Sequence, residues 1–443
     1  MKLYIFITFG LHEMGGGQMY VNSKALWLQK QGWNTIILSP GKEEGWHSIF
    51  TVKDNIHYFP ELYLPIGLYS RRAIKTWLKK AESLITTPYT EIVIESSNEC
   101  FASWGEYLAK QLSAKHFVYT LNERFRNVDG ANINHYDTYY NQYFKFFDFK
   151  HKRKELAGIH EDSLSLLFEK HKIVSENERY FLKAIHGGAV QDIQNSALEQ
   201  LKRYDWNICS IGRLDKEYVP TMLEGVLDFA MLHSDKIIQF VIVSEIGLLA
   251  ESRLKILDSQ SNIIVTRLGT LSPIPRSLFS KIDVVLASSG CAAVSALESV
   301  PTLSIDAKNY LINGVLGYTT KSTLFHSHND AQMNYVQALE EALIVKSYKT
   351  LEFSFDKPFD IENEYAKHMA FLAQSEPKKE YYPILKIRCV PAVYYGKFFA
   401  WFRWKCHDCK TNFKQRIKKL YWDFTIFRWK IEDIFCSFFT KSN

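Results

Sequence analysis

Two short segments in the second half of the chain combine residue types that bind phosphate groups. Residues 212–216 follow an apolar run and contain a glycine, an arginine and a lysine. Arginine presents a planar fork to phosphate oxygens, and lysine presents a movable point charge. Residues 288–292 follow another apolar run and open a helical pattern, so their small side chains would leave backbone N–H groups accessible to a phosphate. The predicted diphosphate ligands are Arg213, Lys216, Ser289, Gly290 and Cys291.

Two carboxylates follow these segments. Glu298 lies one to two turns along the helical pattern, where a carboxylate suits the hydroxyls of a ribose; the alternative is an exposed helix residue. Asp306 comes directly after a further apolar run and would either bind ligand or cap the next segment. The alternative for the two cations is a surface ion pair with Asp215 or Glu217.

Near the start of the chain, Gly15, Gly16 and Gly17 follow an apolar run and open a second helical pattern. Consecutive glycines let the backbone approach a ligand closely, and their N–H groups at the start of a helix suit a phosphate. Their spacing differs from the G-x-G-x-x-G of dinucleotide sites, so a tight strand-to-helix turn is the alternative. His12 and Glu13, just before the loop, are either candidate catalytic residues or solvated loop residues.

Apolar runs alternate with helical patterns along most of the chain, which predicts two α/β units with parallel sheets. Residues 134–155, dense in Tyr, Phe and Lys, are interpreted as an irregular helical insertion, and residues 361–374 as a helix. The expected strands are 3–9, 35–39, 56–59, 92–95, 116–121 and 172–175 in the first unit, and 207–211, 239–243, 262–265, 284–287 and 302–305 in the second.

The segments around residues 212–216 and 288–306 resemble the donor half of a GT-B glycosyltransferase, of the large retaining family 4 (group 1) that builds bacterial surface polysaccharides. The resemblance implies an α/β GT-B fold, with two Rossmann-like doubly wound domains facing a cleft and a helical basic C-terminal tail. It implies an acceptor domain over 1–190, a nucleotide-sugar donor domain over 191–352, a helix returning toward the first domain over 353–376, and the tail over 377–443.

The resemblance assigns roles residue by residue, with departures. The family carries two glutamates separated by seven residues; Glu298 matches the second, which binds the ribose, while Gly290 stands at the first. The gap between Arg213 and the following lysine is shorter than is usual in the family. A histidine that the family often places after the fifth strand is unmatched, and Asn122 and Glu123 are the catalytic candidates there.

The composition of the chain and the absence of certain motifs exclude several classes of protein. Hydrophobic residues make up 47% and charged residues 23% of 443, so large cores are expected and disorder is not. No D-x-D motif is present, so we expect neither a metal nor a cofactor. A hydrolase elbow would need G-x-S-x-G. The only close cysteine pair, Cys406 and Cys409, lacks the second pair of a zinc site, which predicts reduced thiols.

The last 67 residues differ from the rest. Residues 377–443 hold 15 Lys or Arg and 5 Asp or Glu, a net charge of +10, and 18 of the 65 aromatic residues. Aromatic residues recur at steps of three and four with basic residues beside them, which favours an anionic membrane surface as partner. The alternatives are a helical pair packed on its own domain, or nucleic acid, for which no recognition motif is present.

Together these features predict a metal-independent glycosyltransferase of the hexosyltransferase type. It would move a sugar from a nucleotide-sugar to a hydroxyl acceptor, lipid-linked or polysaccharide, as in capsule or lipopolysaccharide assembly, with retention implied by the resemblance. No apolar run approaches the roughly 18 residues of a spanning helix, so we expect a cytoplasmic protein, peripheral at the inner face of the cell membrane. The alternatives are a GT-B-fold sugar-nucleotide epimerase and a non-catalytic partner in a polysaccharide assembly complex.

Overall fold

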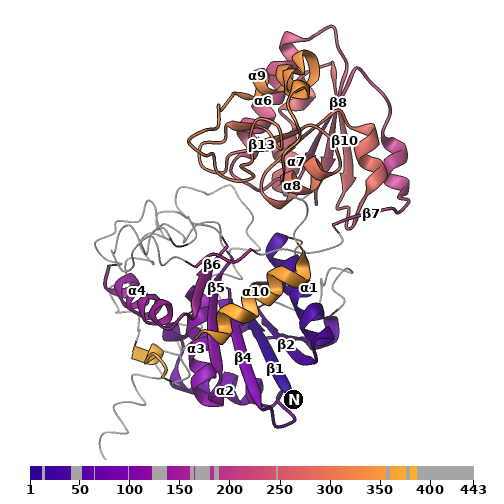
Figure 1. Cartoon of the computed structure of the whole chain (residues 1–443). Coiled ribbons are helices and arrows are strands. Elements are labelled where there is room, and N and C mark those ends of the chain that lie inside the picture. The colour runs from indigo at the N-terminus through magenta and orange to yellow at the C-terminus, as the bar shows by residue number, and fades with distance from the viewer. Residues whose placement is uncertain are drawn as a thin grey trace, which may run out of the picture. The chain divides into compact units, whose positions relative to one another are not determined.

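The chain forms two compact units (Figure 1). Unit 1 consists of residues 1–186 together with the chain from Ile361 onward, and unit 2 of Gly187–Asp360. Within the residues that the structure describes, no helix is both long and apolar enough to cross a membrane. The computed structural model describes residues 1–11, 15–40, 52–63, 65–97, 99–121, 137–159, 164, 180–183, 189–245, 248–355, 360–375 and 380–386.

Unit 1 is built on a six-stranded sheet in the order β3-β2-β1-β4-β5-β6, in which every pair is parallel. Helices cover both faces of this sheet, so each strand is buried on both sides and appears in the sequence as a continuous apolar run. The strands are β1 Lys2–Ile7, β2 Trp33–Ser39, β3 Ile56–Tyr58, β4 Glu91–Ser96, β5 Lys115–Thr120 and β6 Leu156–Gly158. The helices are α1 Gly16–Lys30, α2 Arg71–Glu82, α3 Glu99–Leu112, α4 Asp137–Lys152 and α10 Ile361–Ala373, with short turns η1 Lys53–Asn55, η2 Pro60–Tyr63, η3 Ile66–Leu68 and η12 Ile384–Lys386.

The expected strands that fall within the described residues of both units are present, and one expectation about unit 1 needs correction. The strand expected at residues 172–175 lies outside the described residues and stays a prediction, and the sheet also contains β6, which was not expected. The segment interpreted as an irregular insertion is largely the regular helix α4, which leads into β6 and thus continues the alternation of helix and strand. The dense aromatic residues that suggested irregularity include Phe146 and Phe147, both fully buried against the core.

Unit 2 repeats the architecture with the strand order β10-β9-β8-β12-β13-β14, where only the last pair is antiparallel. Its strands are β7 Val190–Gln191, β8 Trp206–Ile211, β9 Ile238–Val243, β10 Ile263–Gly269, β11 Ile274–Pro275, β12 Val284–Ala287, β13 Thr302–Ile305 and β14 Ile312–Val315, of which β7 and β11 form a separate pair. Its helices and turns are η7 Ser196–Gln200, α6 Val219–Leu232, α7 Leu248–Leu254, η8 Leu257–Ser259, η9 Arg276–Lys281, α8 Gly290–Leu297, α9 Tyr335–Glu340, η10 Glu341–Val345 and η11 Ser347–Thr350.

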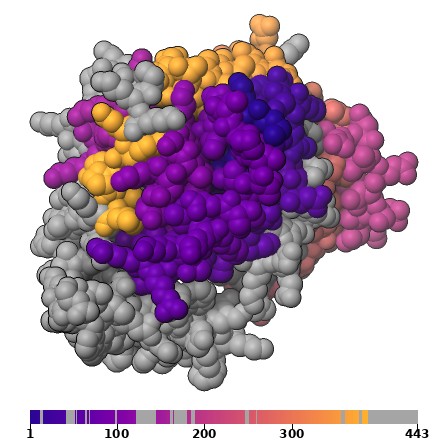
Figure 2. All heavy atoms as spheres, turned by 90° about the horizontal axis from the view of Figure 1, so that it is seen from below, coloured from indigo at the N-terminus to yellow at the C-terminus, as the bar shows by residue number. Residues whose placement is uncertain are grey.

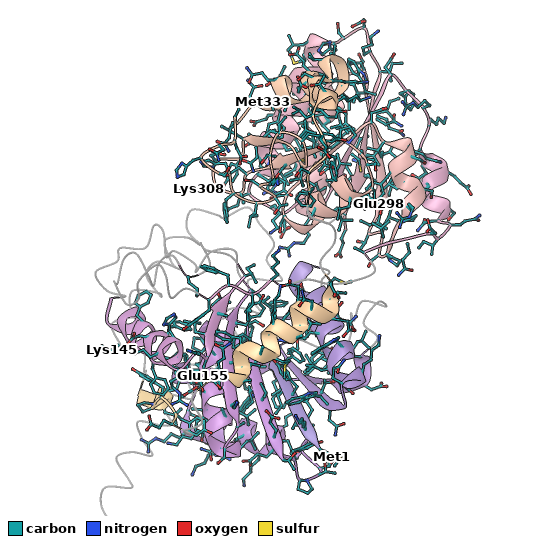
Figure 3. The ribbon with its side chains drawn as sticks, in the orientation of Figure 1. Met1, Lys145, Glu155, Glu298, Lys308 and Met333 are labelled. Atoms are coloured by element: carbon teal, nitrogen blue, oxygen red, sulfur yellow. The ribbon has the colours of Figure 1, made fainter. Side chains whose placement is uncertain are left out.

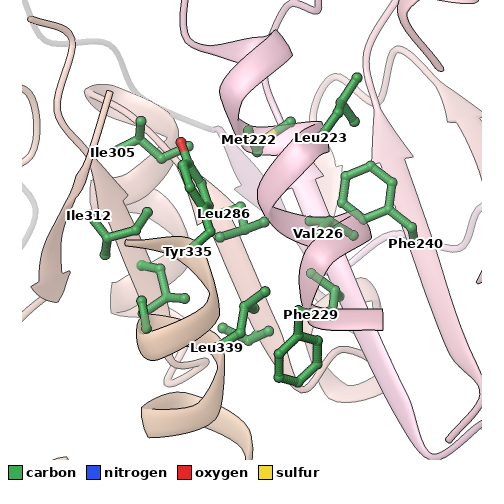
Figure 4. Close-up of a cluster of buried hydrophobic side chains, with 14 of the residues drawn as sticks. Met222, Leu223, Val226, Phe229, Phe240, Leu286, Ile305, Ile312, Tyr335 and Leu339 are labelled. Carbon is green, nitrogen blue, oxygen red and sulfur yellow. The ribbon is translucent and has the colours of Figure 1, made fainter. Parts of the chain in front are cut away.

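The core of unit 2 lies between this sheet and the helices α6 and α9 (Figure 4). Met222, Val226 and Phe229 of α6 are fully buried there, with Leu339 of α9 among their neighbours. The two helices approach closely at Gly225, where a Cβ would lie 2.3 Å from the Cβ of Tyr335. This packing fixes the sheet whose carboxyl edge carries the candidate site.

The helix α10, which returns the chain from unit 2, packs on α1 of unit 1. A buried polar network lies beneath it. Lys24 of α1 is fully buried and pairs with Glu95 of β4 at 2.6 Å, and its Nζ lies 3.2 Å from Nδ1 of His368 on α10. Glu95 also accepts hydrogen bonds from the hydroxyls of Tyr4 at 2.6 Å and Tyr20 at 3.0 Å. Helix α10 is therefore held by polar contacts in addition to the apolar contacts around them.

His368 should make unit 1 sensitive to acid. Burial, with the neighbouring charge of Lys24, lowers the pKa of His368 from 6.5 to about 2. Between these values the unfolded chain binds a proton that the folded chain excludes, so stability falls as pH falls below 6.5. One pKa unit corresponds to about 1.4 kcal/mol, so this group alone should cost about 2 kcal/mol between pH 6.5 and pH 5.

Urea unfolding of the wild type and of His368→Gln at several pH values measures this dependence, and the exposed His328→Gln is the control. We expect a shallower pH dependence in His368→Gln and an unchanged one in His328→Gln. The buried His116, whose pKa is also lowered by burial, should keep part of the slope. Identical slopes in all three proteins would show that folding does not lower the pKa of His368.

Candidate functional site

Three loops meet at the carboxyl edge of the sheet of unit 2. The strands β8, β12 and β13 are neighbours and parallel, so the segments that follow them emerge at the same edge. They lead to residues 212–216, to residues 288–290 and to Asp306, respectively. The chain adds β9 and β10 on one side of β8, and β12 and β13 on the other. Ligands of open α/β sheets bind outside the carboxyl ends of the strands at such a reversal.

The turn after β12 has an unusual backbone. Ser289 precedes α8 with φ of 59° and ψ of −134°, a conformation that costs a non-glycine residue about 1–3 kcal/mol. It is held there by hydrogen bonds from its N–H to the carbonyl of Thr323 at 2.5 Å and from the Ser288 hydroxyl to the carbonyl of Ile305 at 2.9 Å. A Cβ at Gly290 would meet nothing within 4 Å. The first turn of α8 therefore starts from a fixed, strained turn beside open space.

Lys216 of the β8 loop lies close enough to α8 for its charge to act on Cys291. Burial raises the pKa of the Cys291 thiol, and the positive charge of Lys216 opposes that rise, which places Lys216 near the start of α8. Arg213 is 43% exposed and lies 3.4 Å from Asp215, so the surface ion pair considered from the sequence does form. Exposed pairs of this kind contribute at most about 1 kcal/mol, so a phosphate can compete for the guanidinium.

Arg253 of α7 is a supporting residue that the sequence did not indicate. Its Nη1 donates to the backbone carbonyls of Leu214 and Lys216, the latter at 2.9 Å, and so fixes the path of the β8 loop. Glu217, the other carboxylate considered as a partner for the cations, instead accepts a hydrogen bond from the Tyr310 hydroxyl at 2.9 Å. The loop is thus braced from two sides.

Glu298 is at the carboxyl end of α8, and its side chain is only 14% exposed (Figure 3). The alternative of an exposed helix residue is therefore wrong. Its carboxylate pairs with Arg276 of η9, whose Nε also lies 3.0 Å from Asp192. Because Arg276 precedes it by 22 positions and belongs to a separate turn, no local pattern pointed to this partner. The pair with Arg276 holds the Glu298 carboxylate in place at the end of α8.

Asp306 caps the segment that follows β13. One carboxylate oxygen accepts the backbone N–H groups of Lys308 at 2.6 Å and Asn309 at 2.9 Å. The other accepts the N–H of His326 at 2.7 Å, with Nδ1 of the same histidine at 3.1 Å. Burial raises the pKa of Asp306, but these hydrogen bonds outweigh it, and the net pKa is lowered. The capping interpretation is confirmed. Asp306 also holds His326, which the sequence analysis did not identify, at the same edge of the sheet.

The glycine loop of unit 1 lies at the equivalent position, between β1 and α1. Gly15 precedes α1 with an extended backbone that any residue could adopt. Packing requires a glycine at position 17, because a Cβ there would lie 2.3 Å from the ring of Phe9. Gly16, by contrast, faces open space. The candidates His12, Glu13, Asn122 and Glu123 lie outside the described residues.

Comparison with solved structures identifies the fold. A glycosyltransferase from Rickettsia africae ESF-5 matches 89% of this chain and 98% of its own, with a TM-score of 0.54 at 14% identity. Sucrose-phosphate synthase from Thermosynechococcus elongatus matches 84% of this chain and 98% of its own, with a TM-score of 0.53 at 11% identity. A UDP-N-acetylglucosamine 2-epimerase matches 86% of this chain and 99% of its own, with a TM-score of 0.51 at 12% identity. No protein-family model and no curated protein matches the sequence. The chain therefore has the α/β GT-B fold, which glycosyltransferases and epimerases share.

If Glu298 binds a ribose, Glu298→Gln should lower affinity for ribonucleoside diphosphates more than for their 2′,3′-dideoxy analogues. A charge-assisted hydrogen bond exceeds a neutral one by about 1 kcal/mol, so the extra loss should be about fivefold. Calorimetric titration of both ligands measures it, and Glu199→Gln, an exposed change in the same unit, is the control. An equal loss for both ligands would assign Glu298 a structural role only.

Proposed function

We propose that this chain is a glycosyltransferase that takes its sugar from a nucleotide-sugar. The observation that carries the proposal is the carboxyl edge of unit 2, where Arg213 and Lys216 lie on the loop beside the strained turn that opens α8. This arrangement suits a diphosphate, because a loop with two cations and the start of a helix follow neighbouring strands at the strand-order reversal. Glu298, held in place by its pair with Arg276, suits the ribose hydroxyls.

The proposed chemistry is the departure of a nucleoside diphosphate from the sugar. Negative charge grows on the phosphate oxygens as the glycosidic bond breaks, and Arg213 and Lys216 with the N–H groups of α8 would stabilise it. Retention of configuration is proposed from the resemblance to the retaining family, and no side chain is assigned as nucleophile. Gly290 stands where that family has its first glutamate, so contacts to the transferred sugar must come from elsewhere.

The proposed acceptor is a hydroxyl on a lipid-linked or polysaccharide chain. The support is the composition of residues 377–443, basic and aromatic together, which suits an anionic membrane surface at the inner face of the cell membrane. Of this tail, only residues 380–386 are among those that the structure describes. Capsule or lipopolysaccharide assembly would supply such acceptors.

A sugar-nucleotide epimerase is the second candidate, because the fold neighbours include a UDP-N-acetylglucosamine 2-epimerase. Incubation with a panel of nucleotide-sugars, followed by NMR, separates the two activities. A transferase releases free nucleotide when an acceptor is present, and an epimerase converts the sugar while it stays attached to the nucleotide. Epimerisation without nucleotide release would contradict the transferase, and neither reaction over the whole panel would leave a non-catalytic role in an assembly complex.

A further inference from the structure

Helix α2 of unit 1 carries an uncompensated positive face. Arg71, Arg72, Lys75 and Lys79 are all exposed, and none of them forms an ion pair or hydrogen bond with a residue that the structure describes. Glu82, also exposed, is the only carboxylate on the helix. The face therefore keeps a strong positive charge.

The core of unit 1 fixes the direction in which these cations point. Ile74, Trp77 and Ala81 are buried, which turns the opposite side of α2 to solvent. At roughly 100° per residue, the four cations fall within an arc of about 100° on that solvent side. They extend over about 12 Å of helix, at 1.5 Å per residue. The result is a flat basic strip along α2.

The positive charges of this strip destabilise the folded helix. Arg71 and Lys75, and Lys75 and Lys79, are like charges four residues apart, a spacing that destabilises a helix. Arg71 and Arg72 also lie in the first turn, where the helix dipole favours acidic residues, and no acidic residue is present there. An anionic partner would offset both costs, so the strip is better explained by binding than by stability.

The last described residues of the chain lie near the start of this helix. The turn η12 contacts α3 and η3, and η3 ends two residues before the N-cap of α2. The backbone N–H of Tyr382 donates to the buried Glu106 at 2.6 Å, the hydroxyl of Tyr381 donates to the carbonyl of Ala114 at 3.0 Å, and Ile384 is buried. Figure 2 shows the orange residues, which belong to residues 360–375 and 380–386, bordering the purple surface of unit 1.

We propose that the positive face of α2 docks on an anionic lipid surface, next to the point from which residues 387–443 continue. The inference rests on the proposed lipid-linked acceptor, and it adds a contact within the folded unit to that of the tail. Basic residues near an anionic bilayer are attracted to it, and aromatic residues favour its interface. Nucleic acid fits less well, because Trp77, the one aromatic residue of α2, is buried and offers no surface for base stacking.

The test measures partition of the full chain onto vesicles of phosphatidylcholine with and without phosphatidylserine, at 0.1 M salt. Lys75→Glu/Lys79→Glu should weaken partition onto the anionic vesicles at least tenfold, because several units of charge change at the surface. Lys75→Arg/Lys79→Arg should retain it. The control Lys255→Glu/Lys349→Glu makes the same charge change at exposed positions of unit 2 and should have little effect.

Nucleotide release on a soluble acceptor is measured in parallel, and should be equal in all four proteins. Unchanged partition of Lys75→Glu/Lys79→Glu would overturn the inference, and so would an equal loss in the control, which would reflect net charge alone. Tighter binding of the wild type to RNA than to anionic vesicles would also overturn it. Loss of nucleotide release in every protein with vesicle binding intact would refute the proposed function and leave the docking face standing.

Discussion

Lys24→Met is expected to destabilise unit 1 by about 3–5 kcal/mol, because it leaves the carboxylate of Glu95 buried without its cation. Both side chains are almost entirely inaccessible to solvent, at 0% and 1% exposure. Burial lowers the pKa of Lys24, and the attraction of Glu95 opposes this effect. Water does not reach Glu95, so it cannot take the place of the Lys24 ammonium when that group is removed.

Hydrogen exchange of the β1 and β4 amides reports the free energy of opening of unit 1 separately from that of unit 2. The control is Lys2→Met, which breaks the exposed pair of Lys2 with Glu91 and should cost less than about 1 kcal/mol. The double change Lys24→Met/Glu95→Gln should recover part of the loss, because no buried charge is left. A cost for Lys24→Met no larger than that of Lys2→Met would contradict the account of this network.

The second large effect is on ligand binding. Arg213→Ala should weaken binding of a nucleoside diphosphate about tenfold or more, since a hydrogen bond to a charged group contributes about 1.5–3 kcal/mol. The matched control is Arg203→Ala, which removes an exposed arginine of the same unit that pairs with Asp283 at 2.7 Å. Calorimetric titration of the three proteins gives the comparison. Equal affinity in Arg213→Ala and the wild type would remove Arg213 from the site.

The sheets could be predicted from the sequence because their strands are buried on both faces and appear as continuous apolar runs. Two strands of the six-stranded sheets were not predicted, each for a physical reason. Strand β6 has only three residues, Leu156–Gly158. Strand β14, Ile312–Val315, contains an asparagine and a glycine, which are depleted in strands, and it pairs in the antiparallel direction at the edge of the sheet.

Lys24 shows a different limit. Lys24 lies on the buried face of α1, but its partner Glu95 lies 71 positions away on β4. A charged residue on a buried stripe can be recognised from periodicity, whereas the carboxylate that makes its burial tolerable is set by strand order. The network therefore became apparent only in the folded unit.

The candidate site was predictable only in part. Arg213, Ser289 and Gly290 follow apolar runs directly, so strand ends in the sequence placed them at one edge of the sheet. Arg253 and His326 could not be found in this way, because each acts through contacts with loops at least 20 positions away. The strain at Ser289 is likewise a property of the folded turn and has no signature in a serine-rich segment.

The central claim is that a diphosphate binds at the carboxyl edge of unit 2, on the first turn of α8 and the β8 loop. Hydrogen exchange of the full chain with and without nucleoside diphosphates tests it most directly, because the bound phosphate would accept hydrogen bonds from backbone N–H groups of residues 290–292, whereas the N–H of Ser289 already donates to Thr323. The account predicts slower exchange at residues 290–292 and 213–216 with at least one nucleotide of the panel. Tight binding that leaves exchange at both segments unchanged would contradict it.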